Sequence, residues 1–414
     1  NELVCEGCGD CGKKSNCVSV APLETEFGRK RTIDQSSCNK DFSCVKGFCP
    51  SFVTVEGGQL KKRKAVVQEV LSTLPEPVLP SLDRPWGILV TGVGGTGVVT
   101  IGALLGMAAH LEGKGVAVLD MTGLAQKGGS VYTHVRIANA PENIHAVRIA
   151  AGEANVLLGC DMIVSTSDEA LAKMQKGVTS GVVNADVSPT GDFTKQPDLQ
   201  IPVAGMEAVL KDAMAAVDFV DASQLTTALL GDAIYTNPFV MGFGWQKGLI
   251  PLSLASIMRA MELNGASVEK NKQAFDWGRR AAVDLRAVQK VATPPEAKPD
   301  TQRLSQSIEE MVTRRKEFLT GYQDAAWAER YAALVAKVQK LEGEKFPGKK
   351  ALSAAVARYA FKLMAYKDEY EVARLYSQTD FRKRIADQFE GDYKLTFHMA
   401  PPIMSETDPA TGEL

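Results

Sequence analysis

Seven of the eight cysteines lie within the first 49 residues, and their spacing is the clearest chemical signal in the sequence. The first group reads C-x2-C-x2-C-x5-C, and the second repeats this pattern with an aspartate in place of its middle cysteine. Proteins with two iron–sulfur clusters use such spacing, because three close cysteines bind one cluster and the fourth binds the other. The pattern therefore predicts two clusters with crossed ligation.

Crossed ligation assigns each donor to one of two sets. The set for the first cluster, a [4Fe-4S] cluster, is Cys5, Cys8, Cys11 and Cys49. The set for the second is Cys17, Cys38 and Cys44, with Asp41 at the position of the missing cysteine. A carboxylate ligand or an open corner at Asp41 would leave either a [4Fe-4S] or a [3Fe-4S] cluster there. A single-cluster protein is the alternative that this departure leaves open.

Structural zinc and disulfides are the other interpretations of these cysteines. Zinc sites pair C-x2-C units and close with four ligands, which fits two consecutive x2 steps poorly. The sequence contains no secretion signal, so we expect a cytoplasmic protein whose thiols stay reduced. Cys160 stands apart in an apolar run, which predicts a buried small side chain.

A second chemical signal is a glycine-rich turn between an expected strand and an expected helix. The candidate cofactor-binding residues are Gly92, Gly94, Gly95, Thr96 and Gly97. A G-x-G-x-x-G turn in this context lets the backbone approach a phosphate at a helix N-terminus. The same glycines also serve plain strand–helix packing, so a purely structural turn is the alternative.

Three further features belong to this site as candidates. Asp120 closes the next expected strand and could bind a ribose hydroxyl. A second glycine-rich turn contains Lys127, Gly128 and Gly129, where the lysine would add positive charge for a phosphate. His134 lies in the middle of an expected strand, and we interpret it as a structural histidine.

The remaining sequence must position these groups. Its alternation of expected strands and helices predicts an α/β multi-domain protein. At 414 residues several domains are expected. We predict a ferredoxin-like iron–sulfur module at 1–58, a linker at 59–85, a Rossmann-like parallel-sheet domain at 86–292 and a helical region at 300–414. The charge of −2 and the absence of a long apolar run give no reason to expect nucleic acid or a membrane as partner.

Apolar spacing refines this expectation. Strands are predicted at 88–90, 116–119, 131–137, 156–158, 162–164 and 182–183, and helices at 98–110, 252–263 and 267–291. In the C-terminal region, apolar residues at helical spacing are expected to form core faces. These residues are Trp327, Tyr331, Leu334, Val338, Leu341, Leu352, Val356, Tyr359 and Leu363.

The residues of both signals together resemble one enzyme family. The turn Val90–Gly97, the Gln126–Ser130 loop, Thr236-Asn237 with Gly242, and Asn271 with Gly278 resemble the gamma domain of 2-oxoacid ferredoxin oxidoreductases over about residues 86–290. A lysine at 127 replaces the arginine common in that family. The cysteine module and the order of the three regions resemble the long, fused indolepyruvate ferredoxin oxidoreductases.

This resemblance implies an enzyme that uses thiamine diphosphate and Mg²⁺ to decarboxylate an aryl-2-oxoacid oxidatively, forms an acyl-CoA and passes electrons to ferredoxin. It implies coenzyme A binding at the Gly92–Gly97 turn and a homodimer. The Gly-Asp-Gly segment that holds thiamine diphosphate is absent from these 414 residues. By resemblance, that site belongs to thiamine-binding domains of the same polypeptide or complex.

Two other functions remain open from the residues alone. An iron–sulfur oxidoreductase subunit could bind NAD(P) or a flavin at the glycine-rich turn. A non-catalytic electron-transfer adaptor could dock to separate catalytic subunits.

Overall fold

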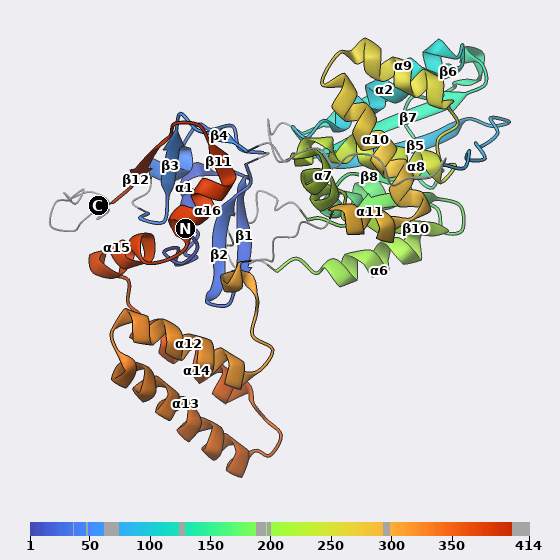
Figure 1. The fold of residues 1–414 in the computed structure, drawn as a ribbon. Helices are drawn as coiled ribbons and strands as arrows, with labels where there is room; N and C mark the ends of the chain where they lie inside the picture. Colours follow the sequence, from blue (N-terminus) through green and yellow to red (C-terminus); the bar gives the residue numbers. More distant parts are fainter. Residues whose placement is uncertain are drawn as a thin grey trace, which may run out of the picture.

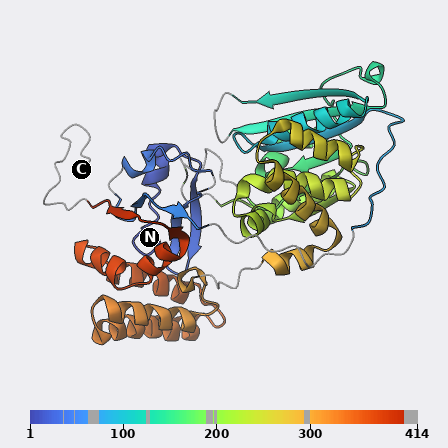
Figure 2. The same ribbon diagram turned by 45° about the horizontal axis from the view of Figure 1, so that its top comes forward.

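A computed structural model of the chain describes residues 1–35, 37–46, 49–61, 74–123, 129–187, 196, 200–292 and 299–399. Figure 1 shows these residues as two bodies. An α/β domain extends from residue 74 to residue 292, and the first 61 residues come together with residues 299–399 in a second body. Figure 2 shows the same division from another direction. We call the second body the cysteine body.

The α/β domain is built on one six-stranded sheet with the order β10-β9-β8-β5-β7-β6. Its strands are β5 (Trp86–Val93), β6 (Gly115–Thr122), β7 (Ser130–Ala138), β8 (Val156–Gly159), β9 (Ser180–Asn184) and β10 (Ala216–Val220). Strand β7 runs antiparallel to both β5 and β6, whereas β5, β8, β9 and β10 are parallel. The predicted parallel sheet is therefore a mixed sheet with one reversed strand.

Helices cover both faces of this sheet. They are α2 (Val98–Leu111), α3 (Met162–Ser165), α4 (Asp168–Leu171), α6 (Val203–Ala213), α7 (Ala222–Leu230), α8 (Thr236–Gln246), α9 (Leu254–Asn264), α10 (Val268–Val283) and α11 (Leu285–Ala292). Ile88 and Val90 of β5 face the larger core, with α2 and α8, while Leu89 between them faces the smaller one, with α3 and α6. This alternation follows from the two-residue period of a strand.

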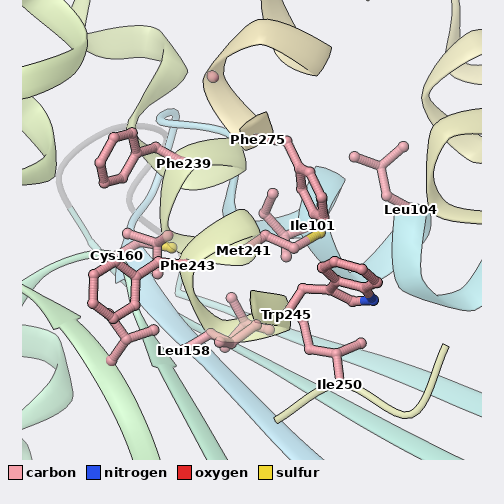
Figure 3. Packing of buried hydrophobic residues seen from close by; sticks show 14 of the residues in the cluster. Ile101, Leu104, Leu158, Cys160, Phe239, Met241, Phe243, Trp245, Ile250 and Phe275 are labelled. Atoms are coloured by element: carbon pink, nitrogen blue, oxygen red, sulfur yellow. The ribbon is translucent and has the colours of Figure 1, made fainter. Parts of the chain in front are cut away.

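The larger core explains why α8 is buried along its whole length. Trp245 of α8 packs against Phe275 of α10 at a ring-centroid distance of 6.0 Å (Figure 3). Cys160 lies in the same cluster, as predicted, and burial raises the pKa of its thiol. The strand predicted at 162–164 is wrong: it is helix α3, whose first turn is capped by Asp161 accepting from the amide of Val164.

The cysteine body begins with short elements separated by loops. They are α1 (Asp10–Ser15), β1 (Val20–Thr25), β2 (Gly28–Ile33), the 3₁₀ turn η1 (Ser43–Lys46), β3 (Val53–Glu56) and β4 (Gln59–Leu60). Strands β1 and β2 form an antiparallel hairpin, and α1 packs against η1. Such a short segment buries little apolar surface by itself.

The C-terminal region completes this body. It consists of α12 (Ile308–Tyr322), α13 (Ala325–Lys345), α14 (Ala351–Met364), α15 (Glu369–Ser377), α16 (Phe381–Gln388), β11 (Phe389–Glu390) and β12 (Lys394–Phe397). Strand β12 pairs with β3, and β11 pairs with β4. The region therefore contains strands in addition to the predicted helices. Phe27 in the β1–β2 turn packs at a tilt against Phe318 and stacks on Phe361, at 5.1 and 5.4 Å between centroids.

The apolar stripe predicted for the C-terminal helices is wrong in part. Tyr331 is buried, but Leu334, Leu341, Tyr359 and Leu363 are 44, 45, 66 and 83% exposed. The core-facing side of α13 is formed instead by smaller residues such as Ala328 and Val335, because these permit close helix packing. Each helix in the described part of the chain is too short or too polar to cross a lipid bilayer.

Candidate functional site

Two glycines shape the loop that carries the first three cysteines. Gly7 and Gly9 have φ values of +73° and +83°, which side chains disfavour. A Cβ atom on Gly7 would lie 2.1 Å from the carbonyl oxygen of Arg29, so only glycine fits between the loop and β2. The loop thereby leaves Cys5 and Cys11 buried and Cys8 exposed.

The electrostatic neighbours of Cys11 are the members of the first predicted set. Burial first, and then the charges of Cys49, Cys5 and Cys8, raise the pKa of the Cys11 thiol to about 12. The pKa of Cys49 is also raised, first by burial and then by Cys5 and Cys8, although its bond with Ser51 opposes the shift. Cys49 thus lies near cysteines more than 37 positions earlier in the sequence, as crossed ligation requires.

The second set gathers around Cys44. Burial raises the pKa of this thiol, and the charges of Cys17, Cys38 and Asp41 contribute to the same shift. Asp41 also has a local structural role, because its Oδ1 accepts from the amide and the hydroxyl of Ser43 at 3.0 and 2.8 Å. These bonds cap the η1 turn and compete with a ligand role for the carboxylate.

A single metal ion and an iron–sulfur cluster require different arrangements of their ligands. Within the described ranges, no three His, Cys, Asp or Glu side chains are arranged to hold one metal ion. Zinc requires its ligands to converge on one point. The cysteines around a cluster bind different irons, so they need only surround it. Neighbouring thiolates repel one another, and this repulsion raises their pKa values. Positively charged iron would offset the repulsion.

Two lysines from distant parts of the chain meet at the Cys5 loop. Lys30 of β2 donates to the Cys5 carbonyl oxygen at 2.6 Å, and Lys367 donates to the same oxygen at 3.3 Å. Burial and the charge of Lys367 lower the pKa of Lys30 to about 8. Lys367 lies 362 positions from Cys5, so no local pattern in the sequence pointed to it.

The glycine-rich turn has the geometry that its sequence predicts. A Cβ atom on Gly92 would lie 2.6 Å from Val98 and 3.1 Å from Cys160, so this glycine is required for close strand–helix packing. Gly95 and Gly97 have φ values of +89° and +92°. Residues 95–97 are exposed, which leaves the N-terminus of α2 open to solvent.

The structure brings the two glycine-rich segments together. The amide of Gly94 donates to the carbonyl oxygen of Gly129 at 2.7 Å, while Lys127 and Gly128 lie outside the described residues. Asn237 at the start of α8 donates to the Thr96 carbonyl oxygen at 2.9 Å and fixes the turn from the other side. Asn237 belongs to the motif that carried the family resemblance, but its contact was not foreseen.

Asp120 is placed away from this turn. Strand β7 lies between β5 and β6, so Asp120 is two strand spacings, roughly 10 Å, from the strand that leads into the turn. Its Oδ1 accepts from the Thr133 hydroxyl at 2.6 Å. The dinucleotide fold needs its acidic residue on the neighbouring strand. A ribose contact by Asp120 stays a prediction, and the strand order counts against it.

His134 and the contact between helices α8 and α10 contribute to the packing of the α/β domain. His134 is fully buried, and its Nδ1 accepts from the amide of Ile149 at 3.2 Å. A Cβ atom on Gly242 or on Gly278 would lie 2.0 Å from a backbone oxygen of the opposite helix, so these glycines allow α8 and α10 to touch.

Two parts of the chain are similar to known protein families. Residues 87–281 match the family described as pyruvate ferredoxin/flavodoxin oxidoreductase, and residues 308–414 match a family of unknown function (DUF6537). The indolepyruvate oxidoreductase subunit IorB of Methanothermobacter thermautotrophicus is 27% identical over 201 residues, covering 48% of this chain and 98% of that subunit. IorB of Pyrococcus horikoshii is 28% identical over 210 residues, covering 49% and 98%.

Solved structures are also similar to part of this chain. The pyruvate oxidoreductase subunit PORC of Thermotoga maritima has 18% identity and a TM-score of 0.35, covering 48% of this chain and 97% of that one. A 2-oxoglutarate:ferredoxin oxidoreductase of Magnetococcus marinus has 17% identity and a TM-score of 0.38, covering 65% and 47%.

Residues 87–281, which contain the glycine-rich turn and helices α8 and α10, are thus similar to the pyruvate ferredoxin/flavodoxin oxidoreductase family. This similarity, together with that to IorB, supports the resemblance to 2-oxoacid ferredoxin oxidoreductases seen in the sequence.

Proposed function

We propose that this chain is the electron-transfer and coenzyme-A-binding part of a cytoplasmic, thiamine-diphosphate-dependent indolepyruvate (arylpyruvate) ferredoxin oxidoreductase. The complete enzyme decarboxylates a 2-oxoacid oxidatively to an acyl-CoA and passes the electrons to ferredoxin. One observation carries the proposal: a domain similar to IorB shares a chain with thiols whose electrostatic neighbours form the two crossed sets.

The cysteine body holds the electron path in this proposal. Iron–sulfur clusters supply one-electron steps that thiamine chemistry lacks. Cys5, Cys8, Cys11 and Cys49 would hold a [4Fe-4S] cluster in a ferredoxin-like module, and the Cys44 set would hold a [4Fe-4S] or [3Fe-4S] cluster. Lys30 and Lys367 place positive charge beside the first loop, which favours an anionic cluster there.

The Gly92–Gly97 turn is the proposed site for coenzyme A phosphates. Exposed backbone at the N-terminus of α2 favours an anion, because the helix dipole adds partial positive charge there. The carbonyl oxygen of Gly129 is bonded to the turn, which supports a role of the second glycine-rich segment at the same site. Lys127 would supply a cation to the same phosphate.

Other components complete the enzyme. Thiamine diphosphate and Mg²⁺ would be bound by domains outside these 414 residues, in the same polypeptide or complex, and the assembly would be a homodimer. The relatives from Methanothermobacter and Pyrococcus are named as subunits, which supports partner domains or subunits here.

An NAD(P)- or flavin-linked subunit is less well supported. The reversed strand β7 separates Asp120 from the turn, so the acidic residue of a dinucleotide site is missing from the neighbouring strand. A non-catalytic electron-transfer adaptor would contain the same cysteine body and α/β domain. It would differ from our proposal only in docking to separate catalytic subunits.

Anaerobic viologen reduction by the full-length protein tests the proposal. Arylpyruvates, pyruvate and 2-oxoglutarate are each supplied with and without coenzyme A. We expect reduction with an arylpyruvate that depends on coenzyme A, and about seven or eight irons per chain with matching sulfide. Reduction by NAD(P)H with no response to any oxoacid would contradict the proposal.

A further inference from the structure

A cavity of about 810 Å³ lies between the Cys8 loop and helix α14. Cys8 lines one side of this cavity, and Arg358, Tyr359 and Lys362 of α14 line the other. Cys8 is also the one exposed thiol among the seven N-terminal cysteines. Of the proposed ligands of the first cluster, it is therefore the one nearest to solvent.

The cavity carries surplus positive charge. Six basic and three acidic side chains line it, and each acidic one forms an ion pair with a basic neighbour. The pairs are Glu6–Lys367, Glu24–Arg29 and Glu26–Arg315. Lys30, Arg358 and Lys362 remain, and within the described residues none of these three pairs with a carboxylate. This uncompensated charge beside Cys8 favours a negatively charged partner.

The outer surface of α14 adds apolar and aromatic contact area to this charge. Arg358 and Lys362 are four residues apart, as are Tyr359 and Leu363, so the two pairs lie along one side of the helix. Tyr359 and Leu363 are 66 and 83% exposed. We call these four residues the α14 face. Exposed tyrosine and arginine are enriched where proteins dock.

We propose that the α14 face, beside Cys8, is the docking surface for an acidic one-electron carrier protein. The inference rests on the proposed function, because it requires a cluster at Cys8 from which an electron leaves. Carboxylates of the carrier would meet the exposed Arg358 and Lys362, while Tyr359 and Leu363 would pack against its surface. A small anion in the cavity would leave Leu363, which lies outside the lining, uncovered.

Charge reversal on α14 tests the docking surface. The double variant Arg358→Glu/Lys362→Glu is compared with Lys337→Glu/Lys340→Glu, which makes the same charge change on exposed positions of α13 outside the cavity lining. The complete oxidoreductase is titrated calorimetrically with an oxidised, acidic two-cluster bacterial ferredoxin at low and high salt. Turnover is then measured with that ferredoxin and with methyl viologen.

The α14 variant should bind the ferredoxin about tenfold more weakly or worse at low salt, and high salt should reduce the difference. The α13 variant should bind within about twofold of the unmodified enzyme, and viologen reduction should not change in either variant. Equal weakening by both variants, unchanged binding by the α14 variant, or loss of the thiamine-bearing component from the α14 variant would each overturn the inference. So would an effect of the α14 variant on phosphate binding alone.

The two proposals fail in different ways. Absence of viologen reduction with every oxoacid contradicts the proposed function, and the docking inference falls with it. Normal viologen reduction with unchanged ferredoxin binding contradicts only the docking surface.

Discussion

The α/β domain and the cysteine body are held together by different kinds of contact. In the α/β domain, strands and helices near one another in sequence bury a large apolar core, as α8 and α10 do around Trp245 and Phe275. In the cysteine body, residues about 290 to 340 positions apart make the decisive contacts, such as Phe27 with Phe318. A short loop-rich segment cannot supply its own core, so the C-terminal helices supply it.

The largest expected effect comes from breaking the buried ion pair that joins the two ends of the chain. Glu26 and Arg315 are 2 and 3% exposed and bonded to each other. Glu26→Ala would leave the guanidinium buried without its partner and should destabilise the cysteine body by about 3–5 kcal/mol. Hydrogen exchange during denaturant unfolding measures each body separately.

Glu24→Ala is the matched control for this variant, because Glu24 pairs with Arg29 while 55% exposed. It should cost at most about 1 kcal/mol. Equal losses in the two variants, or a loss spread over the α/β domain, would contradict the difference between the bodies.

Overpacking the α8–α10 contact should destabilise the α/β domain alone. A Cβ atom at Gly278 would lie 2.0 Å from the Phe239 carbonyl oxygen, so Gly278→Ala must push the helices apart. We expect a loss of about 1–3 kcal/mol or more in the free energy of unfolding. Gly343→Ala in α13 is the control: open space surrounds that position, and alanine should stabilise its helix by up to about 1 kcal/mol.

His134 should make the stability of the α/β domain depend on pH. Burial, aided by Lys173 and Arg148 against the opposing charge of Glu169, lowers the pKa of His134 to about 4 from an ordinary value of 6.5. The unfolded chain takes up a proton below pH 6.5 while the folded chain does not, so stability falls as pH falls from 6.5 towards 4. Between pH 8 and pH 5 we expect a loss of about 2 kcal/mol. His134→Gln should remove that part of the pH dependence; an unchanged profile would show that His134 is not its source.

The smallest expected effect is a change of one iron atom in the iron content per chain. If the second cluster has an open corner at Asp41, Asp41→Cys should raise the iron content by about one per chain and abolish the signal of an oxidised [3Fe-4S] cluster in electron paramagnetic resonance. Asp392→Cys, at an exposed turn, should change neither measurement. Unchanged iron in the Asp41 variant would show either that the corner is already filled or that no cluster is bound there.

The sequence predicted the α/β domain better than the cysteine body. Strands β5 and β8 and helix α2 have strong local apolar patterns, so their positions were predicted closely. The reversed direction of β7 was missed because apolar alternation does not encode strand direction. Strand β10 was missed because Asp218 interrupts its short run at the sheet edge.

Prediction failed where partners are distant in sequence. Strands β11 and β12 contain two and four residues, and each is stabilised by a strand more than 325 positions earlier. The roles of Lys30 and Lys367 at the Cys5 loop, and the exposure of Tyr359 on α14, depend on the same long-range packing. The two thiol sets stay a prediction from cysteine spacing, which reflects the covalent needs of a cluster rather than tertiary contacts.

The crossed ligation of two clusters is the central claim, and cysteine-to-alanine variants test it most directly. Iron and sulfide analysis with paramagnetic resonance is applied to Cys11→Ala, Cys49→Ala and Cys38→Ala in the complete enzyme. Cys49→Ala should lose the same cluster signal as Cys11→Ala and keep the signal that Cys38→Ala loses. If Cys49→Ala and Cys38→Ala instead lose the same signal, each motif binds its own cluster and the crossed arrangement is wrong.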